Sequence, residues 1–471
     1  MPVPTRPRRL LAAALPALIA VALTACNNAQ YPNSVFHNHT DFNRDVGHLF
    51  DILLWLGGFV FVFVESILLY TIFKFRRKSE NDRPKHVHGN TTLEILWTAI
   101  PAVILAFIAV PTVKTIFKTQ AVASSDALQV EVWGHQWWWE FRYPQYTMAG
   151  NGKLDTLTTA NELYVPVGRK VNFKLQTIDV LHSFWIPQMG GKRDLITNHV
   201  NYLWFTPDSV GEGAWNGFCA EFCGSSHANM HFKVFTVTPS NFDSWTKHQM
   251  SPAAFGAVAM KPMPGVVPVT DTTKRQAQTA QTQPGPAQLA QTAPTSGAGA
   301  MTGAVAAPAA AAMAGHEMSA PAAMQVQQAG FVSFPRAKLP AHVIPKTPLP
   351  AGLAFNESLK GDPQRGLDFM NKMGGGCIGC HAIAGNPMMM ARVGPNLTHV
   401  GTRTTIAGGI YPNDTQHLVR WIKNARKMKP GVLMPTLGAG EYDGLTKAFI
   451  PKTGLNDQQI ADIVAYLQSL K

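Results

Sequence analysis

The sequence predicts a multidomain protein in which a two-helix transmembrane hairpin is followed by an all-β domain, a disordered linker and an all-α domain. Three observations predict this class. The 471 residues exceed the roughly 100 to 200 residues of one ordinary domain. Two apolar stretches are each long enough to cross a bilayer. A long segment rich in Ala, Pro and Gln then separates two regions that each carry a close pair of cysteines.

Charge and cysteine usage narrow the possible functions. Lys and Arg number 40 against 28 Asp and Glu, a net charge of +12, which favours an anionic partner or a membrane surface. Because the chain has no zinc-finger or helix-turn-helix signature and no long basic arm, we expect no nucleic-acid partner. An odd total of five cysteines with two close pairs is unlike a disulfide scaffold and indicates metal or cofactor chemistry. They are Cys26, Cys219, Cys223, Cys377 and Cys380.

Residues 1–25 have the pattern of an export signal. Arginines at positions 6, 8 and 9 precede an apolar run over 10–23, and small residues lead up to Cys26. The sequence Leu-Thr-Ala-Cys resembles the bacterial lipoprotein cleavage box, which implies lipid attachment at Cys26. The alternative is an ordinary cleaved signal with an incidental cysteine. Either signal places the folded cysteine pairs in an oxidising compartment.

Residues 26–120 are expected to hold an N-terminal segment and the membrane hairpin. The apolar stretches 46–75 and 93–117 each exceed the ~20 residues that cross a ~30 Å hydrocarbon layer. The loop between them is rich in Lys and Arg, and such short loops stay cytoplasmic. Everything after about residue 120 therefore lies outside the cytoplasm, in agreement with the export signal.

Two carboxylates fall in or beside these stretches. Glu65 lies inside the first, where it either faces a helix partner or water-filled path, or stays protonated and bonds a neighbouring helix. Glu94 begins the second, and the spacing Thr91-x-x-Glu94 is that of a capping box. From the spacing alone, capping is sufficient to explain Glu94.

The β-rich region, within the predicted domain 121–250, predicts a small antiparallel barrel or sandwich, because short Val, Phe and Trp runs alternate with Gly, Pro and Asp turns. It contains a cluster of soft metal ligands that follows the distant His182: Cys219, Cys223, His227 and Met230. Two Cys and two His could bind structural zinc, or the cysteines could form a disulfide. Neither reading explains Met230, whereas thiolate, imidazole and thioether together favour copper, and two cysteines favour a copper pair.

The spacing C-x-E-x-C-x3-H-x2-M after a distant His resembles subunit II of the haem-copper cytochrome c oxidases, and it implies a cupredoxin-like domain with a dicopper CuA centre. The resemblance implies that Cys219 and Cys223 bridge the coppers and that His182 and His227 bind one copper each. It also implies weak ligation by Met230 and by the Glu221 carbonyl, with the Glu221 side chain reaching a magnesium ion shared with subunit I.

The likeness extends over residues 46–250. The segment Gly-His-Gln-Trp-Trp-Trp-Glu at 134–140 is similar to the family's aromatic segment, so Trp137 matches the tryptophan at which electrons enter. On a strand, Trp137 and Trp139 would face one side and Trp138 the other; packing or partner contact is the alternative for each. The position of Glu94 matches a carboxylate at the mouth of the family's proton pathway, a role that can coexist with capping.

Residues 251–345 form a segment of Ala, Pro, Gln, Thr and Gly that predicts a disordered linker. A flexible coil of ~95 residues spans roughly 50 to 60 Å on average, enough for a tethered domain to dock and leave. His316 and the linker methionines are read as solvated residues rather than copper ligands.

Residues 346–471 carry Cys377-Ile-Gly-Cys380-His381, the C-x-x-C-H sequence at which haem is attached covalently. A thioredoxin-like pair is the rival interpretation, but it needs no following histidine. The region resembles an all-α cytochrome c, with His381 and Met434 as the implied iron ligands and a final helix over 457–470. Met428 and methionines 388–390 are alternatives to Met434. A basic stretch over 420–429 is either a docking surface or a solvated helix face.

The whole chain thus resembles subunit II of a bacterial cytochrome c oxidase with a fused cytochrome c domain. The resemblance implies an electron-transfer subunit in the inner membrane, with both redox domains on the periplasmic side. Its expected partners are subunit I and subunit III, with cytochrome c or a reductase complex as donor and membrane lipid around the hairpin. No residue makes a plausible oxygen-binding site, so oxygen reduction and most proton translocation belong to subunit I.

Overall fold

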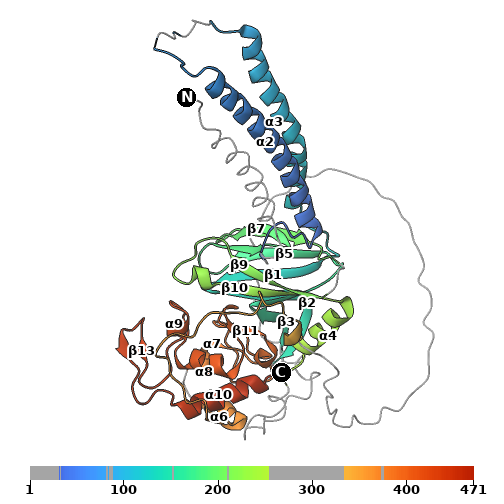
Figure 1. Cartoon of the computed structure of the whole chain (residues 1–471). Helices are drawn as coiled ribbons and strands as arrows, with labels where there is room; N and C mark the ends of the chain where they lie inside the picture. Colours follow the sequence, from blue (N-terminus) through green and yellow to red (C-terminus); the bar gives the residue numbers. More distant parts are fainter. Residues whose placement is uncertain are drawn as a thin grey trace, which may run out of the picture. The chain divides into compact units, whose positions relative to one another are not determined.

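The computed structural model describes residues 31, 33–80, 83, 88–150, 153–208, 212–253, 334–372 and 376–471 (Figure 1). The predicted signal, Cys26 and linker residues 254–333 lie outside the described residues. The described part contains the predicted helical hairpin, a β-sandwich with the cupredoxin-like fold and a C-terminal cytochrome c domain.

Two long helices, α2 (Asp41–Lys74) and α3 (Thr91–Gln120), run side by side as the hairpin. Both are long and apolar enough to cross a membrane, and their apolar side chains are exposed, as lipid-facing surfaces require. The N-cap of α3 differs from the prediction: the Asn90 side chain accepts from the amides of Thr92 and Leu93, so Thr91 is already the first helical residue. Glu94 remains in the first turn, where a carboxylate complements the helix dipole.

The sandwich consists of two five-stranded sheets, ordered β3-β2-β1-β5-β8 and β4-β10-β9-β6-β7. Most neighbours are antiparallel, as expected, but β1 pairs with β5 and β4 with β10 in parallel. The strands are β1 (Leu128–His135), β2 (Trp138–Gly150), β3 (Lys153–Ala160), β4 (Glu162–Pro166), β5 (Val171–Thr177), β6 (His182–Ile186), β7 (Gly190–Leu195), β8 (Asn201–Phe205), β9 (Gly213–Cys219) and β10 (His231–Val237).

The core of the sandwich is aromatic. Alternate residues of β1 are buried, as expected of a strand with one face on the core. The rings of Phe184 and Phe232 stack with centroids 4.9 Å apart, and Trp139 lies 5.4 Å from Phe232. Helix α4 (Pro239–Gln249) closes one end, where Trp245 stacks on Tyr164 at 4.6 Å. This core supports the strand ends that carry the candidate metal ligands.

The base of α2 is bonded directly to the sandwich. Asp41 Oδ1 accepts from the amide of Thr206 at 2.7 Å, and Asn43 Nδ2 donates to the Pro187 carbonyl at 3.0 Å. Arg44 and Asp208 form an ion pair at 2.6 Å. These bonds connect the hairpin to the β-domain through side chains, not only through the chain.

The C-terminal domain is mainly helical, as predicted, with two short hairpins. Gly366 of α6 approaches α10 so closely that an added Cβ would lie 2.1 Å from the Asp462 carbonyl oxygen. Its elements are α6 (Pro363–Lys372), α7 (Cys377–Cys380), η4 (Val400–Thr402), β11 (Thr405–Ile406), β12 (Tyr411–Pro412), α8 (Thr415–Lys423), α9 (Ala425–Met428), β13 (Tyr442–Asp443), β14 (Ala448–Phe449) and α10 (Asp457–Ser469). Two further 3-10 turns precede it, η2 (His227–Asn229) and η3 (Arg336–Lys338).

Both ends of the predicted linker are packed, which corrects the expectation of disorder over all of 251–345. Phe334 is 5% exposed and Val343 is 1% exposed, and both join the core cluster of the sandwich. Ala253 is buried in the cluster of the cytochrome domain. The composition of the segment did not predict these apolar contacts, because the residues that make them are few and far apart in the sequence.

Candidate metal and haem centres

The five side chains of the soft-ligand cluster come together because strand ends meet. Strand β6 begins with His182, and its Phe184 pairs with Cys219, the last residue of β9. The chain then passes through Cys223 and η2, which contains His227, before Met230 leads into β10. A distant histidine and a local motif therefore meet at one end of the sandwich.

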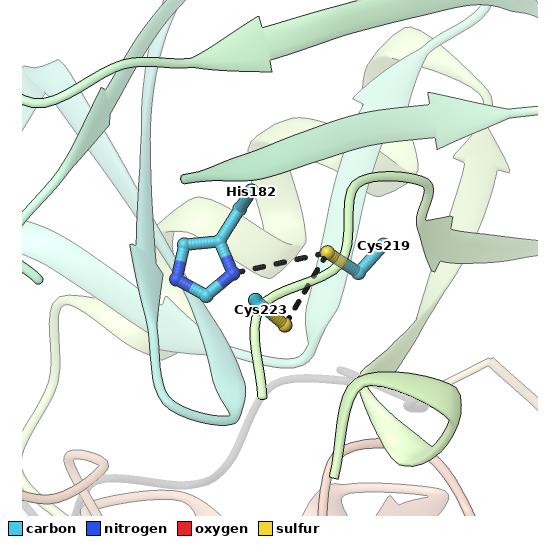
Figure 2. A group of neighbouring side chains, drawn as sticks. All are labelled: His182, Cys219 and Cys223. Atoms are coloured by element: carbon cyan, nitrogen blue, oxygen red, sulfur yellow. Dashed lines mark hydrogen bonds between the residues drawn. The ribbon is translucent and has the colours of Figure 1, made fainter. Parts of the chain in front are cut away.

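Figure 2 shows the centre of this cluster, where the Sγ atoms of Cys219 and Cys223 lie 3.8 Å apart. Each cysteine has its own histidine: His182 Nδ1 lies 3.8 Å from Cys219 Sγ, and His227 Nδ1 lies 3.6 Å from Cys223 Sγ. Met230 Sδ lies 3.8 Å from Cys223 Sγ. Both cysteines are free thiols, so the separation is not a disulfide.

The backbone carbonyl of Glu221 also faces the cluster, 3.3 Å from Cys219 Sγ, while the Glu221 side chain is exposed. The arrangement is nearly symmetric, because each sulfur has one imidazole and one weak donor, a carbonyl or a thioether. Three of these groups, those of His182, Cys219 and Cys223, lie within 4.8 Å of one another. Such a set of soft donors suits copper.

Hydrogen bonds and burial set the protonation of the cluster. The hydrogen bond with Cys223 lowers the pKa of Cys219, and the bond with His182 assists, although burial acts in the opposite direction. The same Cys219 partner and burial raise the pKa of Cys223. Burial lowers the pKa of His182, but the bonds to Asp179 and Cys219 outweigh it and the net shift is upward. The opposite shifts favour a single thiolate, on Cys219, over two.

Asp179 is a functional residue that sequence reasoning missed. Its Oδ1 lies 2.8 Å from Nε2 of His182, so Nε2 carries the proton and Nδ1 faces Cys219. Asp179 Oδ2 also accepts from the amide of Gln136 at 2.7 Å. Its position three residues before His182 was the available signal, but spacing alone does not show that the two side chains meet.

The three consecutive tryptophans do not lie on one strand, so the predicted alternation is wrong for Trp137. Trp137 lies in the turn between β1 and β2, and its Nε1 donates to the Cys223 carbonyl at 2.9 Å. Trp138 stacks on His135 with ring centroids 4.0 Å apart. Trp139 is fully buried in the core. The tight turn places Trp137 directly beside the cysteine loop.

The haem-attachment motif borders a cavity. Cys377 and Cys380 are the ends of α7, and His381 follows as its C-cap. His381 Nδ1 donates to the Pro395 carbonyl at 2.8 Å, which leaves Nε2 available to iron. Cavity-lining residues include Cys377, Cys380, His381, Trp421 and Met434.

Met434 is the methionine candidate that the cavity favours. It lines the same cavity as His381, whereas Met428 is buried in the domain core and does not line it in the described part of the chain. Met389 is also buried, and Met388 and Met390 are largely exposed. The thioether of Met434 and the imidazole of His381 therefore border the same cavity.

Of the five basic residues in the predicted stretch 420–429, three pair with carboxylates, Lys429 is buried and Lys427 is exposed. Arg420 pairs with Glu357 at 2.7 Å, Lys423 with Asp457 at 2.9 Å, and Arg426 with Asp443 at 2.5 Å. Lys429 is buried and donates to the Trp137 carbonyl at 2.6 Å.

The two hairpin carboxylates occupy different surroundings. Glu65 is half-buried on α2, and Glu94 is exposed in the first turn of α3.

Family comparisons agree with this architecture. The family model described as the periplasmic domain of cytochrome c oxidase subunit II matches residues 128–237, and its transmembrane-domain counterpart matches 38–115. The cytochrome c model matches 365–471.

Similar proteins include cytochrome c oxidase subunit 2 of Alkalihalophilus pseudofirmus, 28% identical over 417 residues, covering 86% of this chain and 83% of the relative. The subunit 2 of Bacillus sp. strain PS3 is 30% identical over 412 residues, covering 85% and 80%. That of Bacillus subtilis is 40% identical over 196 residues, covering 38% and 52%.

Fold, site and comparisons together define a membrane protein with a periplasmic redox domain, of the class of electron-transfer subunits in haem-copper oxidase complexes. The chain belongs to the cytochrome c oxidase subunit II family and carries a fused C-terminal cytochrome c domain. It is thus part of an oxidoreductase complex that includes subunit I.

Proposed function

We propose that this chain accepts electrons at a covalently bound haem c and passes them through a dicopper CuA centre to subunit I. There they would reduce oxygen to water with coupled proton translocation. When bound, haem c and CuA each supply a one-electron couple. Cys377, Cys380, His381 and Met434 would hold the haem, and Cys219, Cys223, His182, His227, Met230 and the Glu221 carbonyl would hold the copper pair.

The donor set supports copper over the alternatives. Two thiols 3.8 Å apart, each with its own imidazole, can bridge two metals, whereas a tetrahedral zinc site would leave Met230 Sδ unexplained. Asp179 holds His182 with Nδ1 toward the sulfur, so part of the ligand orientation exists before metal binds. Burial of the cysteines limits access of water to the centre.

The proposed electron route rests on Trp137, which contacts both the haem cavity and the cysteine loop. Its ring lines the cavity that His381 and Met434 also line, and its indole N–H donates to the Cys223 carbonyl at 2.9 Å. Gln136 Nε2 donates to the same carbonyl at 2.7 Å. One side chain therefore connects the haem cavity to the backbone of a copper ligand through a single hydrogen bond.

Further parts of the proposal concern the rest of the oxidase. The exposed Glu221 carboxylate is suited to a magnesium ion shared with subunit I. Glu94, exposed at the start of α3, would lie at a proton entrance, and Glu65 would face a helix partner or water path. We also propose an inner-membrane location in a bacterium, lipid on Cys26 after signal removal, a subunit III neighbour, and cytochrome c or a reductase complex as donor.

The first test is composition and spectroscopy of the purified protein. We expect two coppers and one covalent haem per chain, with a mixed-valence near-infrared band. One zinc, or a Cys219–Cys223 disulfide without metal, would contradict the CuA assignment.

The second test removes the link at Trp137. In Trp137→Phe the aromatic ring remains but the donor to Cys223 is lost, so we expect haem-to-CuA electron transfer to slow on the order of tenfold. Flash reduction of the haem, followed at the CuA band, measures the rate. The matched control is Trp138→Phe, because Trp138 borders the same cavity but stacks on His135. Equal rates in the two variants would refute the route through Trp137.

A further inference from the structure

A buried carboxylate of the sandwich is bonded entirely across to the cytochrome domain. Glu162 begins β4 and is 4% exposed. Its Oε1 accepts from the amide of Thr404 at 2.7 Å, from Thr404 Oγ1 at 2.6 Å and from the amide of Thr405 at 3.1 Å. These donors lie 242 and 243 residues further along the chain, at the start of β11.

Burial of a carboxylate is unfavourable unless donors and cations compensate it. Thr404 and Thr405 supply the donors, and two cations lie near enough to interact electrostatically: Arg403 from the cytochrome domain and Lys233 from β10. Lys233 is itself buried and donates to Asn216 Oδ1 at 2.7 Å. The sandwich thus offers a buried carboxyl group with Lys233 nearby, and the cytochrome domain supplies hydrogen-bond donors to its Oε1.

The segment that Glu162 binds leads directly to the redox centres. Four residues after Thr404, the Gly408 carbonyl accepts from the amide of His231, which follows Met230. Lys429 Nζ joins the two domains at the same place, because it donates to the carbonyls of Trp137 at 2.6 Å and Ala407 at 3.0 Å. One short cytochrome segment, residues 404–408, is therefore held at Glu162 and beside Trp137.

Close backbone approach at this contact requires glycine. Gly408 has φ +79°, and an added Cβ would lie 3.3 Å from the Trp137 carbonyl oxygen and 2.5 Å from Lys429 Nζ. At Gly431, with φ +86°, an added Cβ would lie 2.8 Å from the Trp137 ring. The cytochrome surface is thus shaped to the turn that carries Trp137.

We propose that Glu162 is the docking residue that holds the cytochrome c domain in its electron-transfer position, with the Thr404–Thr405 amides as the group that it recognises. This inference rests on the proposed function, because docking limits turnover only if haem and CuA exchange electrons. The partner is a defined segment of the same chain, at residues 404–405. Glu162 is a positioning residue, since it touches neither centre.

The test is Glu162→Ala in the full chain, loaded with copper and haem and assembled in the oxidase. We expect haem-to-CuA transfer to slow at least about tenfold, with both absorption bands unchanged. Hydrogen exchange at residues 404–408 should become faster in the same variant, which reports docking without any redox step. The control is Glu131→Ala, which removes a carboxylate paired with Lys174 at 3.0 Å within the sandwich and should leave both readouts unchanged.

A second variant, on the cytochrome side of the contact, keeps the test decisive if Glu162→Ala loses the haem or the CuA absorption band. Thr404→Val removes one donor, so a smaller slowing is expected, and the double variant should be no slower than Glu162→Ala alone. A wild-type rate and exchange pattern in Thr404→Val, or in Glu162→Ala with intact bands, would overturn the docking role. If wild-type haem does not reduce CuA but exchange still depends on Glu162, the proposed function fails while docking stands.

Discussion

At the scale of single residues, Asp179 determines how His182 faces the cluster of soft ligands. Its carboxylate accepts a hydrogen bond from Nε2–H and thereby leaves Nδ1 toward Cys219. In Asp179→Asn the amide no longer fixes this tautomer, so we expect copper affinity to fall by about 10- to 100-fold. Competition with a chelator, followed at the near-infrared band, measures it. Asp194→Asn, on neighbouring β7, is the control; equal affinities in the two variants would show that Asp179 has no orienting role.

Site residues could be predicted where they lie close together in the sequence. Cys219, Cys223, His227 and Met230 fall within 12 residues, so spacing and ligand softness were sufficient to group them. Glu162 could not be found in this way, because its partner Thr404 is 242 residues away and the contact exists only after both domains fold.

At the scale of elements, strong periodicity and length were informative and boundaries were not. Both apolar helices were predicted, but the predicted N-cap of α3 was one residue too late. The side chain of Asn90, not that of Thr91, accepts from the first amides of α3. The predicted strand through the tryptophans is a turn at Trp137, because β1 and β2 pair as far as His135 and Trp138. The packed linker ends depend on Phe334 and Val343, whose contacts are distant in sequence.

The contact between α4 and η4 should make stability depend on pH. His399, just before η4, is bonded through Nε2 to the Ser251 carbonyl at 3.0 Å and lies 4.4 Å from the His248 ring. Burial, with a smaller contribution from His248, lowers the pKa of His399 to about 4. The folded state therefore binds fewer protons than the unfolded state between about pH 4 and 6.5. Stability is full above that window and falls with acidification, by at most about 3 kcal/mol.

Denaturant unfolding of the full chain at pH 7, 6, 5 and 4, followed at the haem absorption, measures this dependence. His399→Gln keeps a donor for Ser251 but cannot titrate, so its unfolding free energy should change less over the same range. Identical slopes for the two proteins would exclude His399 as the source.

At the scale of the whole molecule, two sets of side-chain bonds connect the sandwich to its neighbours in the proposed electron route. Glu162 and Lys429 connect it to the cytochrome domain, and residues at the base of α2 connect it to the membrane hairpin. The first set governs electron entry to CuA in our proposal. In the same proposal, the second set governs the position of CuA relative to the membrane, and hence to subunit I.

This division predicts that the two electron-transfer steps can be impaired separately. Asp41 Oδ1 accepts from the amides of Phe42 and Thr206, so Asp41→Ala removes a bond between α2 and the sandwich. A lost hydrogen bond of roughly 0.5–1.5 kcal/mol should slow CuA-to-subunit I transfer by about 2- to 10-fold, while haem-to-CuA transfer stays unchanged. Flash reduction resolves both steps in one sample, and Asp51→Ala, an exposed change on α2, is the control. Equal slowing of both steps in Asp41→Ala would mean that the sandwich itself is perturbed, and no slowing would mean that the hairpin bonds do not set the position of CuA.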